Sequence, residues 1–155
     1  MLDYLDGVPD FKKWMEQASS SKSSVQEAYQ SFTARVAAFI CALDVIWPDF
    51  IEYEGLILRG NVSAERLQTY LEQARQAGWS PADIEHVHNH VHLSDLFMND
   101  PDRSLIPPEV YRAIAGEIAS SWRCKLNFLF PDRRFEVGVR EEEGTSPEVY
   151  AYSAT

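Results

Sequence analysis

The sequence has little cysteine, little basic charge and no long apolar run. Its 155 residues include two cysteines, Cys41 and Cys124, and they do not form a CxxC motif, so neither a zinc knuckle nor a CxxC redox site is expected. Each cysteine lies in an apolar helical pattern, which predicts two small buried side chains in a reducing compartment. The longest apolar run, residues 36–46, is interrupted by Asp44 and is too short to span a membrane.

Basic residues are outnumbered, 14 against 24 acidic residues, which gives a net charge of −10. Such a surface repels phosphate backbones and anionic lipids, so neither nucleic acid nor a membrane is expected as a partner. Acidity of this kind either keeps a protein soluble or attracts a basic protein. The acidic first residues also lack the basic segment of a secretory signal, which predicts a cytoplasmic location.

The chain divides into a short N-terminal segment and one domain. Residues 9–17 predict an amphipathic helix, and the serine-rich stretch 19–24 predicts a flexible link. We therefore expect residues 1–24 to form an N-terminal amphipathic helix with its linker. Residues 25–155 are long enough to form one domain with its own core.

Hydrophobic spacing predicts an α+β domain. Four helices are expected over 24–46, 63–78, 80–92 and 107–129, each with a capping residue or a proline near its start. Two antiparallel hairpins are expected, 50–53 with 56–58 and 135–139 with 149–152. The fold class is thus a small antiparallel sheet from two β-hairpins, packed against four to five helices.

No sequence motif of a catalytic site is present. The chain lacks GxSxG, a Walker loop and GxGxxG. Glu52 and Glu54 flank Tyr53 and could serve as an acid/base pair, but alternating acids on a strand are typical of a solvated face. Arg133 and Arg134 follow a helix end, where basic side chains favour the local dipole. We therefore expect a protein without catalytic activity.

All four histidines lie between residues 86 and 92. On a helix they form two pairs four residues apart, His86 with His90 and His88 with His92. A zinc ion held by His86, His90 and Asp95 would support a metal-dependent hydrolase, although the HExxH motif of metalloproteases is absent. The alternative is that one pair is buried and hydrogen-bonded while the other is solvated.

Tyrosines and glutamates gather on the predicted strands. If the two hairpins share one sheet, its outer face is acidic and tyrosine-rich, which suits a lysine- and arginine-rich partner. The alternative is that the tyrosines pack against the helices. The predicted partner-binding residues are Glu52, Tyr53, Glu54, Glu142, Glu143, Tyr150 and Tyr152.

Four segments carry a resemblance to a known class of proteins. They are residues 47–55 (WPDFIEYEG), 89–97 (NHVHLSDLF), 122–126 (WRCKL) and 130–135 (FPDRRF). Over 47–137 the chain resembles small bacterial immunity proteins that accompany polymorphic toxins. The resemblance implies a non-catalytic protein that binds and neutralises a toxin in the cytoplasm of the producing cell, and it assigns no functional residues. A further alternative is an accessory subunit of a larger bacterial complex, docked through its N-terminal helix.

Overall fold

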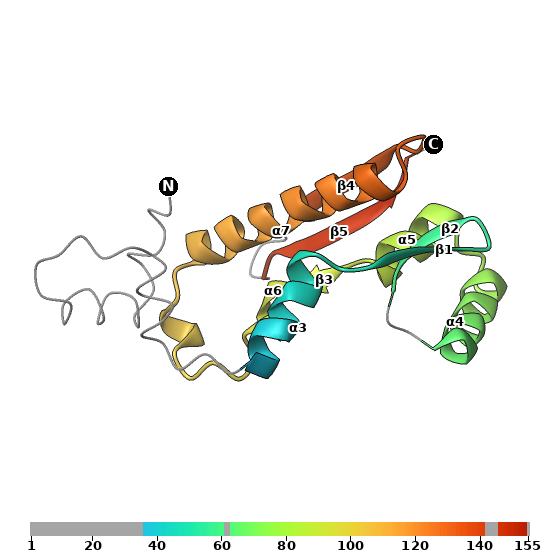
Figure 1. The fold of residues 1–155 in the computed structure, drawn as a ribbon. Helices are drawn as coiled ribbons and strands as arrows, with labels where there is room; N and C mark the ends of the chain where they lie inside the picture. Colours follow the sequence, from blue (N-terminus) through green and yellow to red (C-terminus); the bar gives the residue numbers. More distant parts are fainter. Residues whose placement is uncertain (1–35, 61–62, 142–145, 155) are drawn as a thin grey trace, which may run out of the picture.

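The computed structural model describes residues 36–60, 63–141 and 146–154, and it confirms the predicted α+β class (Figure 1). Both kinds of element recur along the chain, and two small antiparallel sheets are formed. The helices are α3 (Val36–Ile46), α4 (Ala64–Gln76), α5 (Pro81–His88), α6 (Leu93–Leu96) and α7 (Pro108–Leu129), with a 3-10 turn η2 (Arg103–Leu105). The strands are β1 (Phe50–Tyr53), β2 (Leu56–Arg59), β3 (Val91–His92), β4 (Phe135–Arg140) and β5 (Glu148–Ser153).

Three of the helices begin where capping residues predict. The hydroxyl of Ser63 accepts a hydrogen bond from the first turn of α4. At α5, Ser80 and Asp83 form a reciprocal capping box, and Pro81 occupies the first helical position. Pro108 opens α7 in the same way. These local signals fix the starts of the helices before any tertiary contact is considered.

The first hairpin closes through a turn that needs left-handed backbone. Glu54 has φ 51° and Gly55 has φ 83°, so both central residues lie in the region that a type I′ turn requires. The turn pairs β1 with β2 in register, with Tyr53 opposite Leu56. The predicted hairpin is therefore present, and Gly55 supplies the conformation that other residues adopt only at a cost.

The prediction that the two hairpins share one sheet is wrong, because they belong to two separate sheets. β1 and β2 form a two-stranded sheet, whereas β4 and β5 join the short β3 in the order β3-β5-β4. β5 is thus the central strand of the second sheet, paired antiparallel on both sides. Tyrosines on the two hairpins consequently do not lie on one common sheet face.

Two hydrophobic clusters form the core. The larger one surrounds α7, where Trp122 is fully buried, meets the ring of Phe50 edge-on at 5.9 Å, and donates its indole N–H to the carbonyl of Val45 at 2.7 Å. The smaller one joins β2 to α4 and α5 through Leu56, Leu58, Leu67, Leu71, Ala74 and Ile84. The second sheet therefore packs on the α7 cluster, whereas the first sheet contributes to both clusters, with Phe50 and Ile57 in the larger one and Leu56 and Leu58 in the smaller one.

A buried carboxylate on α5 connects the two sheets. Glu85 is 1% exposed, and its side chain accepts hydrogen bonds from the backbone amide of Ile57 on β2 and from the amide and hydroxyl of Ser153 on β5. Each carboxylate oxygen thus has a donor, which is what a charged group in a dry site requires. Glu85 links two strands that do not pair with each other.

Asn89 makes a second link one helical turn later. Its side-chain oxygen accepts from the amide of Arg59, and its amide group donates to the carbonyls of Ile57 at 2.8 Å and Ala151 at 3.2 Å. The amide is therefore used as donor and acceptor at once, between β2 and β5. Together, Glu85 and Asn89 take the place of strand pairing between the sheets.

The predicted helix over residues 80–92 is wrong in its second half. α5 ends at His88, Asn89 takes a non-helical conformation with φ −98°, and Val91 and His92 form β3 beside β5. The side-chain contacts of Asn89 explain the early end, because they hold this residue between two strands. The short helix α6 that follows was not predicted either.

The predicted burial of the cysteines is also wrong, because both Cys41 and Cys124 are exposed. Cys124 lies two positions after Trp122, which is about 200° around the helix, so it faces away from the buried stripe of α7. Within the described ranges, no helix combines the length and apolar character needed to cross a bilayer. The predicted N-terminal helix and linker over 1–24 lie outside the described residues.

Candidate functional site

The histidine segment lines a pocket with a volume of about 330 Å³. His86 comes from the end of α5, His90 from the loop that follows, and His92 from β3. The remaining polar groups come from the second hairpin. We call this site the histidine pocket; it is lined by His86, Val87, His90, His92, Arg140, Ser146 and Glu148. Because α5 stops at His88, the three imidazoles reach the pocket from three consecutive local structures and not from one helix face.

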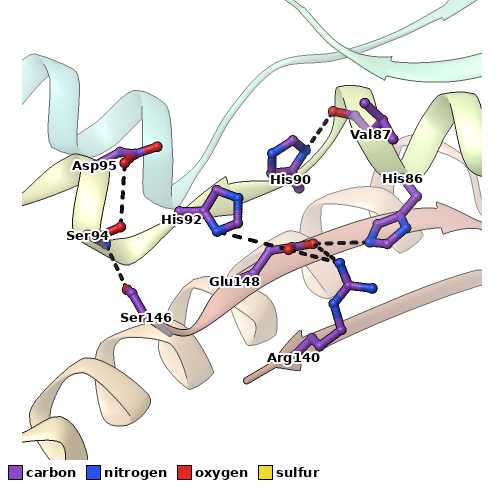
Figure 2. A network of polar contacts seen from close by, with 9 residues as sticks. All are labelled: His86, Val87, His90, His92, Ser94, Asp95, Arg140, Ser146 and Glu148. Carbon is purple, nitrogen blue, oxygen red and sulfur yellow. Dashed lines mark hydrogen bonds and ion pairs between the residues drawn. The ribbon is translucent and has the colours of Figure 1, made fainter. Parts of the chain in front are cut away.

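Glu148 lies at the centre of the polar network (Figure 2). Its carboxylate accepts two hydrogen bonds from the Arg140 guanidinium, at 3.1 and 3.3 Å, and one from Nε2 of His86 at 3.1 Å. Nδ1 of His92 lies 4.0 Å from the other carboxylate oxygen. One carboxylate therefore orients two basic side chains, His86 from α5 and Arg140 from β4, and His92 from β3 lies nearby.

The ionisation of Glu148 reflects two opposing effects. Burial alone would raise the pKa of this carboxyl, since the charged form loses solvation. The hydrogen bonds and charge of Arg140 act in the other direction, with help from His86 and His90, and the net result is a lowered pKa. The pocket therefore contains a stable carboxylate paired with a guanidinium.

The His86 ring also packs against two tyrosines of β5. Its centroid lies 5.0 Å from that of Tyr150 and 5.8 Å from that of Tyr152, and the two phenol rings stack on each other. A Cβ at Gly138 would come within 2.7 Å of the Tyr150 hydroxyl, so the bare backbone of β4 makes room for this ring. His86 is thus held both by a charge partner and by aromatic packing.

His88 faces away from the pocket. Its Nε2 lies 3.1 Å from the carbonyl of Arg59, and its ring packs against Tyr70 at 5.5 Å. Burial is the main cause of a lowered pKa for His88; the hydrogen bond with the Arg59 carbonyl opposes this shift, and the charges of Arg59 and His90 add to it. One histidine is therefore set into the protein while the other three line the pocket.

The predicted metal ligands are not assembled. His86 is bound to Glu148, Nδ1 of His90 donates to the carbonyl of Val87 at 2.6 Å, and Asp95 lies on α6 beside the hydroxyl of Ser94. Asp95 does not line the pocket. Within the described part of the chain, no three His, Cys, Asp or Glu side chains are placed to hold a metal ion. The early end of α5 is the physical reason, because it breaks the spacing on which the prediction depended.

The predicted partner-binding residues occupy two regions. Glu52 forms an ion pair with Arg133, and Glu54 pairs with Arg75. Tyr53 is half-buried against the smaller core cluster. Tyr150 and Tyr152 pack around His86, as described above. Glu142 and Glu143 lie outside the described residues.

A second surface lies where the β1 region meets the end of α7. The Lys125 ammonium sits 5.1 Å above the centre of the Trp47 ring and 3.6 Å from the carboxylate of Asp49. Further along, Arg133 pairs with Glu52. These contacts align the chain from Trp47 to Glu52 with the chain from Lys125 to Arg133.

Two exposed aromatic side chains lie on these two aligned segments. Trp47 is 46% exposed, and Phe128, one helical turn after Lys125, is 79% exposed. A phenyl ring that is 79% exposed buries little apolar area in the isolated domain. We call this region the β1–α7 surface; it comprises Trp47, Asp49, Glu52, Glu54 and Phe128.

Comparison of the chain with known protein families, with curated proteins and with solved structures found no match.

Sequence reasoning missed Arg140 and Glu148 as functional candidates. They lie directly opposite each other in the register of β4 and β5. Opposite charges at facing positions of a predicted hairpin were the available signal. It was not used because the length of the connecting turn, and hence the register, is not fixed by the hydrophobic pattern. Phe128 was missed because the helical spacing of α7 identifies its buried stripe, to which Phe128 does not belong.

Proposed function

We propose that this chain is a non-catalytic protein-binding module that binds a basic protein, in the manner of the immunity proteins it resembles. One observation supports this proposal above the others: Phe128 is 79% exposed and lies one helical turn after Lys125, which contacts Trp47 and Asp49. Aromatic side chains surrounded by polar groups are the usual energetic centres of protein interfaces.

Charge adds a reason to expect a basic partner. The chain carries a net charge of −10, and Asp49, Glu52 and Glu54 follow Trp47 closely along the chain. Opposite charge on a partner speeds encounter and selects against acidic competitors. The ion pairs of Glu52 with Arg133 and of Glu54 with Arg75 are exposed, so a partner's basic side chains can replace them at small cost.

The proposal is tested with the protein encoded by the adjacent reading frame. The two purified proteins are mixed and examined by size-exclusion chromatography with light scattering, and by calorimetry at low and high salt. We expect a complex of equal stoichiometry whose affinity falls as salt rises, because exposed charges are screened. A neighbouring product that forms no complex at either salt concentration contradicts the immunity-like proposal.

Matched variants locate the binding surface. Phe128→Ala and the double variant Glu52→Lys/Glu54→Lys should each weaken binding by about tenfold or more, which is the effect of losing an interface centre. The control is Glu72→Lys/Glu117→Lys, which makes the same charge change at exposed positions on α4 and α7 outside this surface. Equal losses in the test and control pairs would leave only net charge as the cause and reject this surface.

A further inference from the structure

We propose that the histidine pocket binds a small oxyanion, a phosphate-type or carboxylate group, and binds it more tightly when its histidines are protonated. The proposal is independent of the protein-binding function, since the histidine pocket and the β1–α7 surface share no residue.

The pocket has the size and the donors for such a ligand. Its volume of about 330 Å³ is enough for a small molecule or a terminal group. His86, His90 and His92 converge on it with Arg140 and Ser146, and they come from α5, its following loop, β3, β4 and the residues before β5. Nitrogen donors around one cavity are the chemistry that recognises oxyanions.

The carboxylate already in the pocket does not exclude an anion. Glu148 receives two hydrogen bonds from Arg140 and one from His86, so its charge is matched within the wall of the pocket (Figure 2). In the described part of the chain, the hydrogen bond of His90 goes to a backbone carbonyl, and Nδ1 of His92 lies 4.0 Å from Glu148, beyond hydrogen-bond reach. These two imidazoles are the groups that can turn to a ligand.

The tautomer of His90 makes binding depend on protonation. Nδ1 lies 2.6 Å from the carbonyl oxygen of Val87, which can only accept, so Nδ1 carries the hydrogen. In the neutral ring, Nε2 then presents a lone pair, which repels an oxyanion. Protonation converts Nε2 into a charged donor, and protonation of His92, whose ring centroid lies 5.0 Å away, adds a second positive charge.

Other charged groups near the pocket keep a constant charge over this range. Carboxyl groups stay ionised and Arg140 stays protonated between about pH 6 and pH 8, while imidazoles titrate. The change in pocket charge is therefore set by the histidines. The surrounding groups on the packed elements are Asp83 on α5, Asp95 on α6, Glu136 and Arg140 on β4, and Glu148, Tyr150 and Tyr152 on β5.

The experiment uses untagged full-length protein and two probes. Sulfate is a tetrahedral dianion and acetate a planar monoanion, and neither changes charge between about pH 6 and pH 8, so any pH effect belongs to the protein. Binding is followed by calorimetry and by the imidazole signals in NMR spectra, assigned with single His→Gln variants. Stronger binding of sulfate identifies a phosphate-type site, and stronger binding of acetate identifies a carboxylate site.

We expect saturable 1:1 binding of one probe at about pH 6, weaker by about tenfold or more at pH 8, with shifts in the signals of His90 and His92. The double variant His90→Gln/His92→Gln should lose this binding. If the double variant does not fold, the two single variants are used as the test. His88→Gln is the matched control and should bind normally, because His88 faces Arg59 and Tyr70 outside the pocket. Affinity that is equal at both pH values, survives the double variant or never saturates would overturn the proposal.

Discussion

The carboxylate of Glu85 accepts a hydrogen bond of 2.7 Å from the backbone amide of Ile57, a residue 28 positions earlier in the chain. The same carboxylate reaches Ser153 on the central strand of the other sheet. A single buried side chain on α5 thus satisfies donors from two sheets that have no strand pairing with each other. The stability of the domain should depend on it.

Replacing Glu85 should be among the most damaging single changes. Glu85→Ala leaves the amides of Ile57 and Ser153 and a hydroxyl without their acceptor in a buried site, so we expect a loss of about 2–4 kcal/mol in the free energy of unfolding. Urea denaturation followed by circular dichroism measures it. Glu65→Ala, at an exposed position in the first turn of α4, is the control and should change stability by less than about 1 kcal/mol. Equal effects of the two substitutions would contradict the role given to Glu85.

Asn89 provides a test by a nearly isosteric change. Asn89→Asp replaces the amide group that donates to the carbonyls of Ile57 and Ala151 with an oxygen that repels them. We expect a destabilisation of about 2–4 kcal/mol at neutral pH. The variant should recover part of its stability in acid, where the new carboxyl is protonated and can donate. An Asn89→Asp protein as stable as the parent would show that these contacts contribute little.

Replacing Gly55 in the hairpin turn and Gly116 in α7 by alanine should change stability in opposite directions. Gly55→Ala forces a Cβ into a backbone with φ 83° and should cost about 1 kcal/mol. Gly116→Ala lies within α7, where an added Cβ meets nothing within 4 Å, and should stabilise by up to about 1 kcal/mol. Thermal unfolding of both variants gives the comparison. The same sign of effect at the two positions would contradict the turn geometry.

His88 should make stability fall as the pH drops below about 6.5. Burial lowers its pKa from the ordinary value of 6.5, so the unfolded chain binds a proton in this range that the folded chain does not. Folding is therefore favoured above this pH and progressively less below it. The difference in unfolding free energy between the parent and His88→Gln should narrow as the pH is lowered from about 8 to 5.5. A difference that stays constant across the range would show that His88 is not the cause.

Glu148 should act in a separate, more acidic window. Its pKa is lowered from the ordinary value of 4.5, because Arg140 and His86 outweigh the effect of burial. Its stabilising contribution is complete above about pH 4.5 and is lost as the pH falls through the lower folded value. Unfolding experiments on the parent and Glu148→Gln between about pH 6 and pH 3 should show converging stabilities only below about pH 4.5. If the unfolding free energies of the two proteins already converge at pH 6, the pH dependence would belong to the histidines and not to Glu148.

Local signals were enough to predict most elements of the fold. Ser63, the Ser80–Asp83 box and the Glu54–Gly55 turn act through neighbouring residues, so they are readable without tertiary information. The separation of the sheets and the end of α5 were not readable, because they depend on hydrogen bonds of Glu85 and Asn89 to residues about 30 to 70 positions away.

The candidate site was predicted in composition but not in geometry. The clustering of histidines pointed to the segment that lines the pocket, yet the helical spacing predicted Asp95 as their partner where the structure has Glu148. That partner comes from β5, 62 positions later than His86, and its place follows from the register of the hairpin. Facing charges such as Arg140 and Glu148 can be sought in any predicted hairpin once its turn is defined.

The strand order β3-β5-β4 has a consequence for the synthesis of this protein. β3 and β4 both hydrogen-bond to β5 and not to each other, so neither has a strand partner in this sheet until residues 148–153 have left the ribosome. The first hairpin and α4, by contrast, form from residues 50–76. A nascent chain halted before residue 148 should therefore contain the folded first hairpin and α4, while the second sheet is not yet formed. The apolar face of α7 would then be exposed to solvent and available to a chaperone.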